Sequence, residues 1–452
     1  MRVIIVGAGR IGRNLAKSLV QEDNEVYLVE KDEQVARKSG EKLDAKVIVG
    51  NGADPDVLKK AHMSEAELVI AVSPSDEVNL VVCFLARLFG AKRCIARVRN
   101  TALSETLAQF GYDRFHIDEL INPELVAAQA IRKIVETPGA SEVADFADGK
   151  ILLRAFNISE TSPLCGAKIG DFRDEDFPWP FLIVSVVRNK SVIIPKGDTA
   201  IQVGDRIYVL LPAPSLGEFL TFVNPEAKPP KKIVIYGATI TGKHTAKSLV
   251  GVAEDILLIE EDEDVAKEVA GELENVRIIN GSASEKDILT ECGIEATDVF
   301  IATSKDDHAN LVSSLLAKKM GAKTTIIMAQ HEDYMPVVSA LDIDAIINPH
   351  YLAGEKILHL VRGKGISAVT KLLEGETEAL EFIPEEGSPV TKGPLKTINF
   401  PKDSIIGAVY SGKEVILASG EVQIKAGERV IVFCQETAVK KLQQLFTCRK
   451  YF

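Results

Sequence analysis

Short runs of apolar residues alternate with longer amphipathic stretches along residues 1–135. The short runs are rich in Val and Ile, as in strands buried on both faces of a parallel sheet, and the stretches between them have the length and spacing of helices. The pattern predicts strands near 2–6, 26–29, 46–49, 67–72, 94–98 and 114–117, with helices between them. This alternation predicts an α/β fold with a doubly wound parallel sheet.

Two helix starts are marked clearly. Asp54-Pro55 and Asn122-Pro123 each place a capping side chain before a proline whose missing N–H costs nothing at the first helical position. The second pair opens a predicted helix, 123–136, that leaves the sheet.

The next stretch of the chain, 141–225, follows a different pattern. Its apolar residues alternate with polar ones in short runs, and Gly-Asp turns separate these runs. Examples are the runs 181–187, 192–195 and 206–211. The pattern predicts a small β-rich lobe with little helix.

The whole pattern occurs twice, because residues 1–225 and 231–452 carry the same signals in the same order. Val3–Gly7 recurs as Ile233–Gly237, and Val29-Glu30 recurs as Ile259-Glu260. The later correspondences are Asn51-Gly52 with Asn280-Gly281, Asn79 with Asn310, Asn122-Pro123 with Asn348-Pro349, Pro195–Asp198 with Ala418–Glu421, and Val203–Arg206 with Ala426–Arg429.

The repeat predicts four domains. They are a Rossmann-like lobe at 1–136, a small β-rich α+β lobe at 141–225, a second Rossmann-like lobe at 231–361 and a second small lobe at 367–452. A proline-rich polar segment, Asn224–Lys231, is the expected linker between the two halves.

The motif Gly7-x-Gly9-x-x-Gly12 stands between the first strand and a helix at 10–22. In a dinucleotide-binding loop the first glycine allows the tight turn, the second lets a pyrophosphate approach the backbone, and the third allows close helix–strand packing. Glu30 ends the second strand, where a carboxylate accepts hydrogen bonds from ribose hydroxyls and repels a 2′-phosphate. We therefore expect NAD(H) or an adenosine nucleotide rather than NADP(H). The alternative is that Glu30 only caps a strand end.

Arg97 and Arg99 follow the fifth strand, at the sheet edge where ligands of doubly wound folds bind. They are candidates for neutralising phosphates. An ordinary solvated pair is the alternative, and it is favoured more for Arg99 than for Arg97.

The second glycine loop, Gly237–Gly242, departs from the first because Thr239 replaces the middle glycine. We also place Gln330 where Arg97 stands, so a cation is lost, although Glu260 remains. The second site is expected to be weaker, altered or empty. The segment misses the P-loop pattern by one residue, since His244 has no hydroxyl to hold Mg²⁺.

Composition narrows the function. A formal net charge of −12 argues against nucleic acid as a partner. No apolar run is long enough to span a bilayer, no leader precedes the first strand, and six scattered cysteines fit reduced thiols in the cytoplasm. The seven histidines are dispersed without metal-ligand spacing or an acid/base arrangement. We predict no metal site and no enzymatic activity.

Five segments together resemble the Trk-type potassium uptake regulatory family, TrkA. They are Gly7–Gly12, Glu30, Asn51–Asp54, Ser73–Asn79 and Ile95–Val98. The resemblance covers the whole chain. It implies two tandem RCK units, regulators of K⁺ conductance, each built from a Rossmann lobe and a small C-terminal lobe.

The resemblance also implies a role and a site. The chain is expected to be a cytoplasmic peripheral subunit on the cytosolic face of the cell membrane, where it forms a homo-oligomeric ring, expected to be a tetramer. The ring would gate a membrane potassium-translocating subunit of the TrkH/TrkG type, with NAD(H), ATP or ADP as regulatory ligands. The implied ligand contacts are Gly7, Gly9, Arg10, Ile11, Gly12 and Arg97 at phosphates, Glu30 at ribose, and Asn51, Gly52, Ala53, Asp54 and Ser73 around the nucleotide. A weaker second site would comprise Gly237, Thr239, Ile240, Gly242, Glu260, Gly281 and Ser282.

Two other functions stay open at this point. One is an NAD-dependent oxidoreductase, which the glycine loop supports but no acid/base constellation does. The other is a nucleotide sensor for another cation transport system.

Overall fold

The computed structural model describes residues 1–172, 179–189, 191–224, 228–331, 341–361, 366–371, 377–401 and 404–448. It divides into two compact units. The first comprises Met1–Ala127 with Asn348–Val361, and the second comprises Ala128–Ile347 with Arg362–Phe452. Each unit therefore contains residues from both halves of the repeat. The four domain boundaries given above stay predictions, and residues 225–227 of the expected linker lie outside the described residues.

The first unit is built on a six-stranded parallel sheet with the order β3-β2-β1-β4-β5-β6. Its strands are β1 (Arg2–Val6), β2 (Glu25–Glu30), β3 (Lys46–Val49), β4 (Leu68–Ala71), β5 (Arg93–Arg97) and β6 (Glu119–Ile121). This order places the topological switch point between β1 and β4, and the doubly wound prediction is confirmed.

The strand expected at 114–117 is wrong. His116 adopts a left-handed backbone with φ of +59° at the end of a short 3₁₀ turn, which no strand residue can do. The sixth strand begins later, at Glu119, and two of its three residues are only half buried. Because this strand lies at the sheet edge, no apolar run marked it in the sequence.

Helices cover both faces of this sheet. They are α1 (Arg10–Gln21), α2 (Glu33–Lys42), α3 (Pro55–Lys60), α4 (Asp76–Phe89) and α5 (Thr101–Phe110), with 3₁₀ turns η1 (Met63–Glu65) and η2 (Tyr112–Phe115); α6 (Pro123–Val135) follows β6. Both proline-marked helix starts are confirmed. The Asp54 side chain accepts a hydrogen bond from the N–H of Asp56 at 2.9 Å, and Asn122 accepts one from Glu124 at 3.1 Å.

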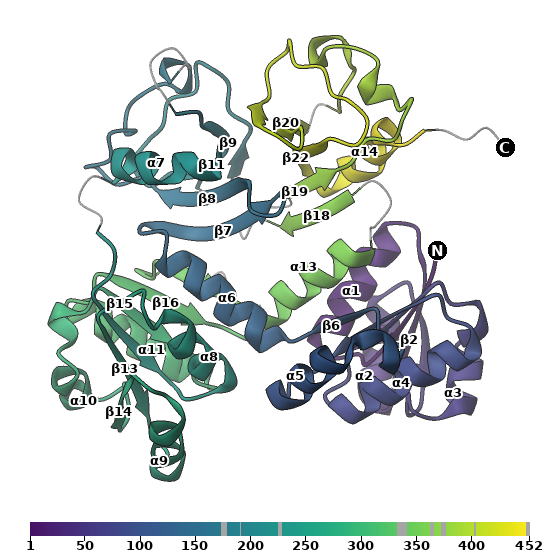
Figure 1. Ribbon diagram of the computed structural model, residues 1–452, viewed down its shortest axis with the longest axis horizontal. Helices are drawn as coiled ribbons and strands as arrows, with labels where there is room; N and C mark the ends of the chain where they lie inside the picture. The colour runs from purple at the N-terminus through teal and green to yellow at the C-terminus, as the bar shows by residue number, and fades with distance from the viewer. Residues whose placement is uncertain are drawn as a thin grey trace. The chain divides into compact units, whose positions relative to one another are not determined.

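One face of this sheet is completed by a helix from the other half of the chain. Helix α13 (Pro349–Val361) runs beside α1 in Figure 1. The α13 residues Ala353, Ile357, Leu358 and Val361 share one hydrophobic core with Val3, Ile5, Ile11, Leu15, Leu19 and Ile95 of the first half. A helix that follows the second sheet in sequence therefore supplies core residues to the first unit.

The second unit contains the second parallel sheet, with the order β14-β13-β12-β15-β16-β17. Its strands are β12 (Lys232–Tyr236), β13 (Asp255–Glu260), β14 (Arg277–Asn280), β15 (Val299–Ala302), β16 (Thr324–Met328) and β17 (Ala345–Ile347). Its helices are α8 (Ile240–Leu249), α9 (Glu263–Glu272), α10 (Lys286–Glu291) and α11 (Asp307–Lys319), with the turn η5 (Ile294–Ala296). The strand order repeats that of the first sheet, which confirms the duplication.

The same unit holds two antiparallel five-stranded sheets. The first has β7 (Ala140–Phe146), β8 (Ile151–Asn157), β9 (Leu182–Arg188), β10 (Ser191–Ile193) and β11 (Arg206–Pro212), with η3 (Ile169–Asp171), η4 (Ala213–Ser215) and α7 (Leu216–Val223). The second has β18 (Ile366–Lys371), β19 (Thr377–Phe382), β20 (Ser404–Tyr410), β21 (Val415–Leu417) and β22 (Arg429–Gln435), with η7 (Pro389–Thr391), η8 (Leu395–Thr397), η9 (Glu436–Ala438) and α14 (Val439–Phe446). The predicted β-rich lobes are confirmed.

The two antiparallel sheets pack face to face (Figure 1). Tyr208 and Leu210 of the first lie in one core with Ile431 and Phe433 of the second. Helices α7 and α14 each close a separate core on the opposite face of their own sheet. Both sheets also repeat a glycine turn, with φ of +82° at Gly204 and +80° at Gly427, as the sequence correspondence predicted.

Candidate functional site

The glycine loop joins β1 to α1 at the carboxyl edge of the first sheet. Gly7 has φ of +107°, and a Cβ atom there would lie 2.8 Å from the backbone nitrogen of Ser73. A Cβ atom on Gly12 would lie 1.9 Å from the carbonyl oxygen of Gly7. The protein's own backbone therefore requires both glycines. A Cβ atom on Gly9 would meet nothing within 4 Å, so this glycine leaves open space.

That space lies at the N-terminus of α1. Gly9 is the N-cap residue and makes no side-chain capping hydrogen bond, and the first turn contains no acidic side chain. The N–H groups at a helix start have no partner within the helix and carry the positive end of its dipole. The loop can therefore receive an anionic group such as a phosphate. Arg10 and Ile11 begin this helix, with Ile11 buried.

Glu30 lies beside the same loop. Its carboxylate accepts hydrogen bonds from the backbone N–H of Ala8 at 2.7 Å and of Asp32 at 3.0 Å. These contacts fix the side chain at the end of β2, next to the glycine turn. A carboxylate has about four acceptor sites, so it can take further hydrogen bonds from ligand hydroxyls.

The segment Asn51–Asp54 forms a turn between β3 and α3. Asn51 accepts a hydrogen bond from the N–H of Ala53 at 3.0 Å, and Asp54 caps α3. A Cβ atom on Gly52 would lie 2.2 Å from Cγ1 of Val6 at the end of β1. The turn is therefore held tightly against the strand that leads into the glycine loop, and two of its polar side chains maintain local structure.

Arg97 ends β5 and is only 9% exposed. Its Nε has no hydrogen-bond partner in the described part of the chain. Ile95 lies in the core formed with α1, and alternation along the strand places Arg97 on that same face. Burial lowers the pKa of the guanidinium, and the nearby Glu124 carboxylate opposes this effect. A buried donor left unpaired is suited to an incoming anion.

Arg99 has a different role. Its Nε donates to Glu124 at 2.7 Å, and its backbone N–H donates to Asp76 at 3.0 Å. Arg99 thus takes part in an ion pair with Glu124 at the surface.

Asn79 and Asp76 were not among the predicted site residues. Asn79 is fully buried and contacts both Ser73 and the carbonyl oxygen of Arg97. Asp76 accepts hydrogen bonds from two backbone N–H groups that follow β5. The available signal was a polar residue at the same place in both repeats, Asn79 and Asn310. On α4 the other buried residues, Val82, Cys83 and Ala86, are apolar.

The second glycine loop has similar backbone geometry. Gly237 has φ of +95°, and a Cβ atom on Gly242 would lie 2.0 Å from the carbonyl oxygen of Gly237. Glu260 accepts from the N–H of Ala238 at 2.7 Å, as Glu30 does from Ala8. Thr239, however, accepts a hydrogen bond from Gly242 at 3.1 Å and donates to the carbonyl oxygen of Thr303 at 2.9 Å. The N-terminus of α8, which begins at Ile240, is therefore closed by a side chain of the protein.

The correspondence between Gln330 and Arg97 is wrong. Asn79 donates to the carbonyl oxygen of Arg97, whereas Asn310 donates to that of Met328, so Met328 occupies the position of Arg97. Gln330 corresponds to Arg99, because their backbone N–H groups bind Asp307 and Asp76 respectively. The predicted loss of a cation holds, since neither Met328 nor Gln330 is charged.

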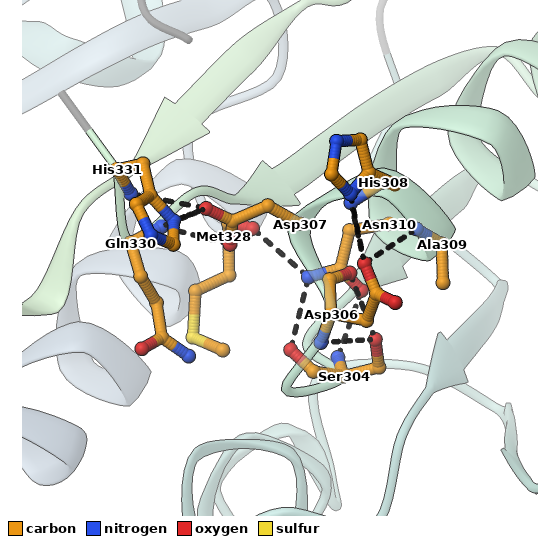
Figure 2. A network of polar contacts seen from close by, with 9 residues as sticks. All are labelled: Ser304, Asp306, Asp307, His308, Ala309, Asn310, Met328, Gln330 and His331. Carbon is orange, nitrogen blue, oxygen red and sulfur yellow. Dashed lines mark hydrogen bonds and ion pairs between the residues drawn. The ribbon is translucent and has the colours of Figure 1, made fainter. Parts of the chain in front are cut away.

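Figure 2 shows the network around Asp307, which is buried. Asp307 accepts hydrogen bonds from the backbone N–H of Gln330 at 2.9 Å and of His331 at 3.0 Å, and its Oδ2 lies 2.7 Å from Nδ1 of His331. Polar groups of the protein thus contact one another at the edge where the first half presents Arg97.

A second correspondence also needs correction. Gly281 matches Gly50 rather than Gly52, because the φ angles of Gly50 and Gly281 are +155° and +156° and their N–H groups bind Glu30 and Glu260. Ser282 then matches Asn51. Ser282 and the hydroxyl of Tyr236 both donate to Glu261, each at 2.6 Å. Burial and this bond raise the pKa of Tyr236.

The helices in the described residues are all too short or too polar to cross a bilayer. In the same part of the chain, no three His, Cys, Asp or Glu side chains gather as metal ligands would.

Comparison with known proteins identifies the family. The TrkA-N domain matches residues 3–123 and 233–349, and the TrkA-C domain matches residues 153–224 and 380–447. The chain is 33% identical to Trk system potassium uptake protein TrkA homolog 1 of Methanosarcina mazei, over 99% of this chain and 100% of that protein. It is 32% identical to the TrkA of Haemophilus influenzae over the full length of both.

Solved structures share the fold. The GsuK RCK domain superposes with a TM-score of 0.62 at 18% identity, covering 98% of this chain and 94% of that one. The GsuK channel bound to NAD gives a TM-score of 0.63 at 18% identity, covering 98% and 78%. The sequence relatives are named as potassium uptake proteins of the Trk system. The chain therefore belongs to the Trk system potassium uptake protein TrkA family.

Proposed function

We propose that this chain is a nucleotide-binding regulatory subunit that gates a membrane potassium-translocating protein. The observation that carries the proposal is the open N-terminus of α1 at Gly9, together with the unpaired, buried Nε of Arg97 on the same face of the sheet. Relatives at about one-third identity are named for potassium uptake, and GsuK structures are described as bound to NAD and to ADP.

The ligand is an adenosine nucleotide, NAD(H), ATP or ADP. Phosphates lie at Gly7, Gly9, Arg10, Ile11 and Gly12, with Arg97 as counter-charge. Glu30, anchored by Ala8 and Asp32, accepts the ribose hydroxyls and disfavours a 2′-phosphate. The rest of the nucleotide is bordered by Asn51, Gly52, Ala53, Asp54 and Ser73.

The second site does not take phosphate. Thr239 fills the anion position with its own hydrogen bonds, and Met328 replaces the cation. The second half then has a Rossmann loop without a phosphate ligand. The other residues of this site are Gly237, Ile240, Gly242, Glu260, Gly281 and Ser282.

Gating requires no chemistry. A nucleotide shifts the membrane partner only if it binds one conformation of the assembly more tightly than another, and a coupling of ~1–3 kcal/mol changes the affinity about 5–150-fold. The assembly is a homo-oligomeric ring, proposed as a tetramer, on the cytosolic face of the membrane.

Reconstitution tests the proposal. The chain is added to proteoliposomes that hold the potassium-translocating protein from the same organism, and K⁺ flux is measured with NADH, ADP, ATP or no nucleotide. We expect at least two nucleotides to give different fluxes, and Gly9→Val to remove the difference. Identical flux under every condition, or turnover of NADH with metabolites, would contradict the proposal.

A further inference from the structure

We propose that Asn79 is a positioning residue for phosphate binding, holding Arg97 and the glycine turn in their relative places. This inference rests on the proposed function of the first site. Asn79 lies on α4, is fully buried, and is not one of the residues expected to contact the nucleotide.

The side-chain amide of Asn79 uses all its donors within the protein. Its Nδ2 donates to the carbonyl oxygen of Ser73 at 3.0 Å and to that of Arg97 at 2.9 Å. Its Oδ1 accepts from the N–H of Ser73 at 2.9 Å. Only this orientation of the amide satisfies two carbonyl acceptors and one N–H donor, so the side chain has a single arrangement.

These bonds join the ends of two neighbouring strands, and the end of a third lies against one of them. Ser73 follows β4, and Arg97 ends β5. A Cβ atom on Gly7, which follows β1, would lie only 2.8 Å from the backbone nitrogen of Ser73, so the glycine turn and Ser73 are in close contact. Since β4 lies between β1 and β5, one buried amide fixes the glycine turn, the loop beside it and the strand that carries the guanidinium.

Arg97 needs this support. Its guanidinium is buried and its Nε is unpaired, so its own contacts do little to hold the end of β5 in place. A displacement of about 1 Å at a charged contact is enough to weaken binding strongly. Asn79 holds the backbone of Arg97 directly and thereby sets where the charge lies.

The second half provides a matched control. Asn310 is also fully buried and makes the same three bonds, to the N–H of Ser304 at 2.9 Å and to the carbonyl oxygens of Ser304 at 3.0 Å and Met328 at 2.9 Å. Its bonds support an uncharged residue beside a closed loop. Removing either amide removes the same three hydrogen bonds, so the two losses of stability should be similar. Only Asn79 supports a residue proposed to contact phosphate.

The test uses the full-length chain and ADP as the probe, with binding measured by calorimetry at 25 °C. We expect Asn79→Leu to weaken ADP binding about tenfold and Asn310→Leu to leave ADP binding unchanged. Both variants should lower the melting temperature by similar amounts. Leucine has the same number and branching of side-chain non-hydrogen atoms as asparagine and adds no charge. If Asn79→Leu does not fold, Asn79→Ser, which keeps one hydroxyl donor, carries the same expectation with a smaller loss.

A double-variant cycle separates positioning from general destabilisation. If Asn79 acts through Arg97, then Asn79→Leu weakens ADP binding by less than about twofold when Arg97→Met is already present. Two outcomes would overturn the role of Asn79 and leave the proposed function standing. One is that the losses of ADP affinity from the two substitutions multiply independently, and the other is unchanged ADP binding in a folded Asn79→Leu protein. A wild-type chain that binds neither ADP nor NADH would overturn the proposed function, and this inference with it.

Discussion

The hydroxyl of Thr239 accepts a hydrogen bond from the backbone N–H of Gly242 at 3.1 Å, and so closes the first turn of α8. The equivalent helix in the first half begins after Gly9, which has no side chain to do this. The two halves therefore end the same strand–turn–helix motif in two ways. One helix start is capped by a side chain of the protein, and the other has no side-chain cap.

Gly9→Val should abolish the thermal stabilisation that ADP or NADH gives to the wild-type protein. A Cβ atom there would meet no atom within 4 Å apart from those of the adjacent residues, so the melting temperature without nucleotide should change little. Melting curves with and without nucleotide measure both effects. Gly12→Val is the contrasting variant, because its Cβ would lie 1.9 Å from the carbonyl oxygen of Gly7 and should destabilise the fold itself. Retained nucleotide stabilisation in Gly9→Val would contradict this account of the loop.

Thr239→Val should have the opposite signature. It removes a helix cap and the bond to the Thr303 carbonyl oxygen, so stability should fall by about 1 kcal/mol, the typical cost of losing an N-cap side chain. Nucleotide-dependent stabilisation should persist, because the first site is untouched. Urea unfolding with and without ADP checks this. If Thr239→Val lost as much nucleotide-dependent stabilisation as Gly9→Val, the proposed asymmetry between the two loops would be refuted.

Arg97→Met copies into the first half the residue that the second half already has, Met328. We expect ADP affinity to fall about tenfold or more, since a hydrogen bond to a charged group contributes roughly 1.5–3 kcal/mol. Stability without nucleotide should be unchanged or higher, because a buried donor without a partner is removed. Calorimetry and urea unfolding measure the two effects. A large loss of stability without nucleotide would show instead that Arg97 has a structural role.

Stability should depend on pH through Glu25, which bonds to Lys46 and Arg2 across the first three strands. The hydrogen bond from Lys46, followed by that from Arg2, lowers the pKa of Glu25 to about 2 from 4.5. A carboxyl group whose pKa is lower in the folded protein contributes to the free energy of unfolding. This contribution is fully present above pH 4.5 and is lost as the pH falls toward 2.

Melting temperatures of the wild type and Glu25→Gln over this range test the effect. Their difference should be largest above pH 4.5 and should shrink steadily below it. Because the Glu25 side chain is 40% exposed, added salt should reduce the difference. A difference that stays constant down to pH 3 would exclude Glu25 as its source.

The strand and helix pattern could be predicted from the sequence because strands buried on both faces leave continuous apolar runs. The sheet edge could not. Strand β6 pairs on one side only, and two of its three residues are half buried, so the nearby apolar Ile117 drew the prediction too early.

The site was predictable where backbone geometry dictates residue type. Gly7 and Gly12 are required by close approaches of the protein to itself, and Glu30 ends a strand that the pattern already marked. Matching residues between the repeats was less reliable. The apolar run of β16 continues through Ala329, beyond the end of the strand at Met328, and so Gln330 was taken for the strand-end residue. The hydrogen bond from Asn310 and the strand pairing of Met328 with Ile347, like that of Arg97 with Ile121, identify Met328 as the equivalent of Arg97.

The placement of α13 bears on how such a duplicated chain evolves. Ile357 and Leu358 belong to the second copy of the repeat, yet they fill the core beneath the first sheet. A shortened chain that ended at the linker would expose that apolar surface to water. Selection for the first copy therefore also preserves the second. The second copy can therefore persist for the structure that it gives to the first, whatever its own glycine loop binds.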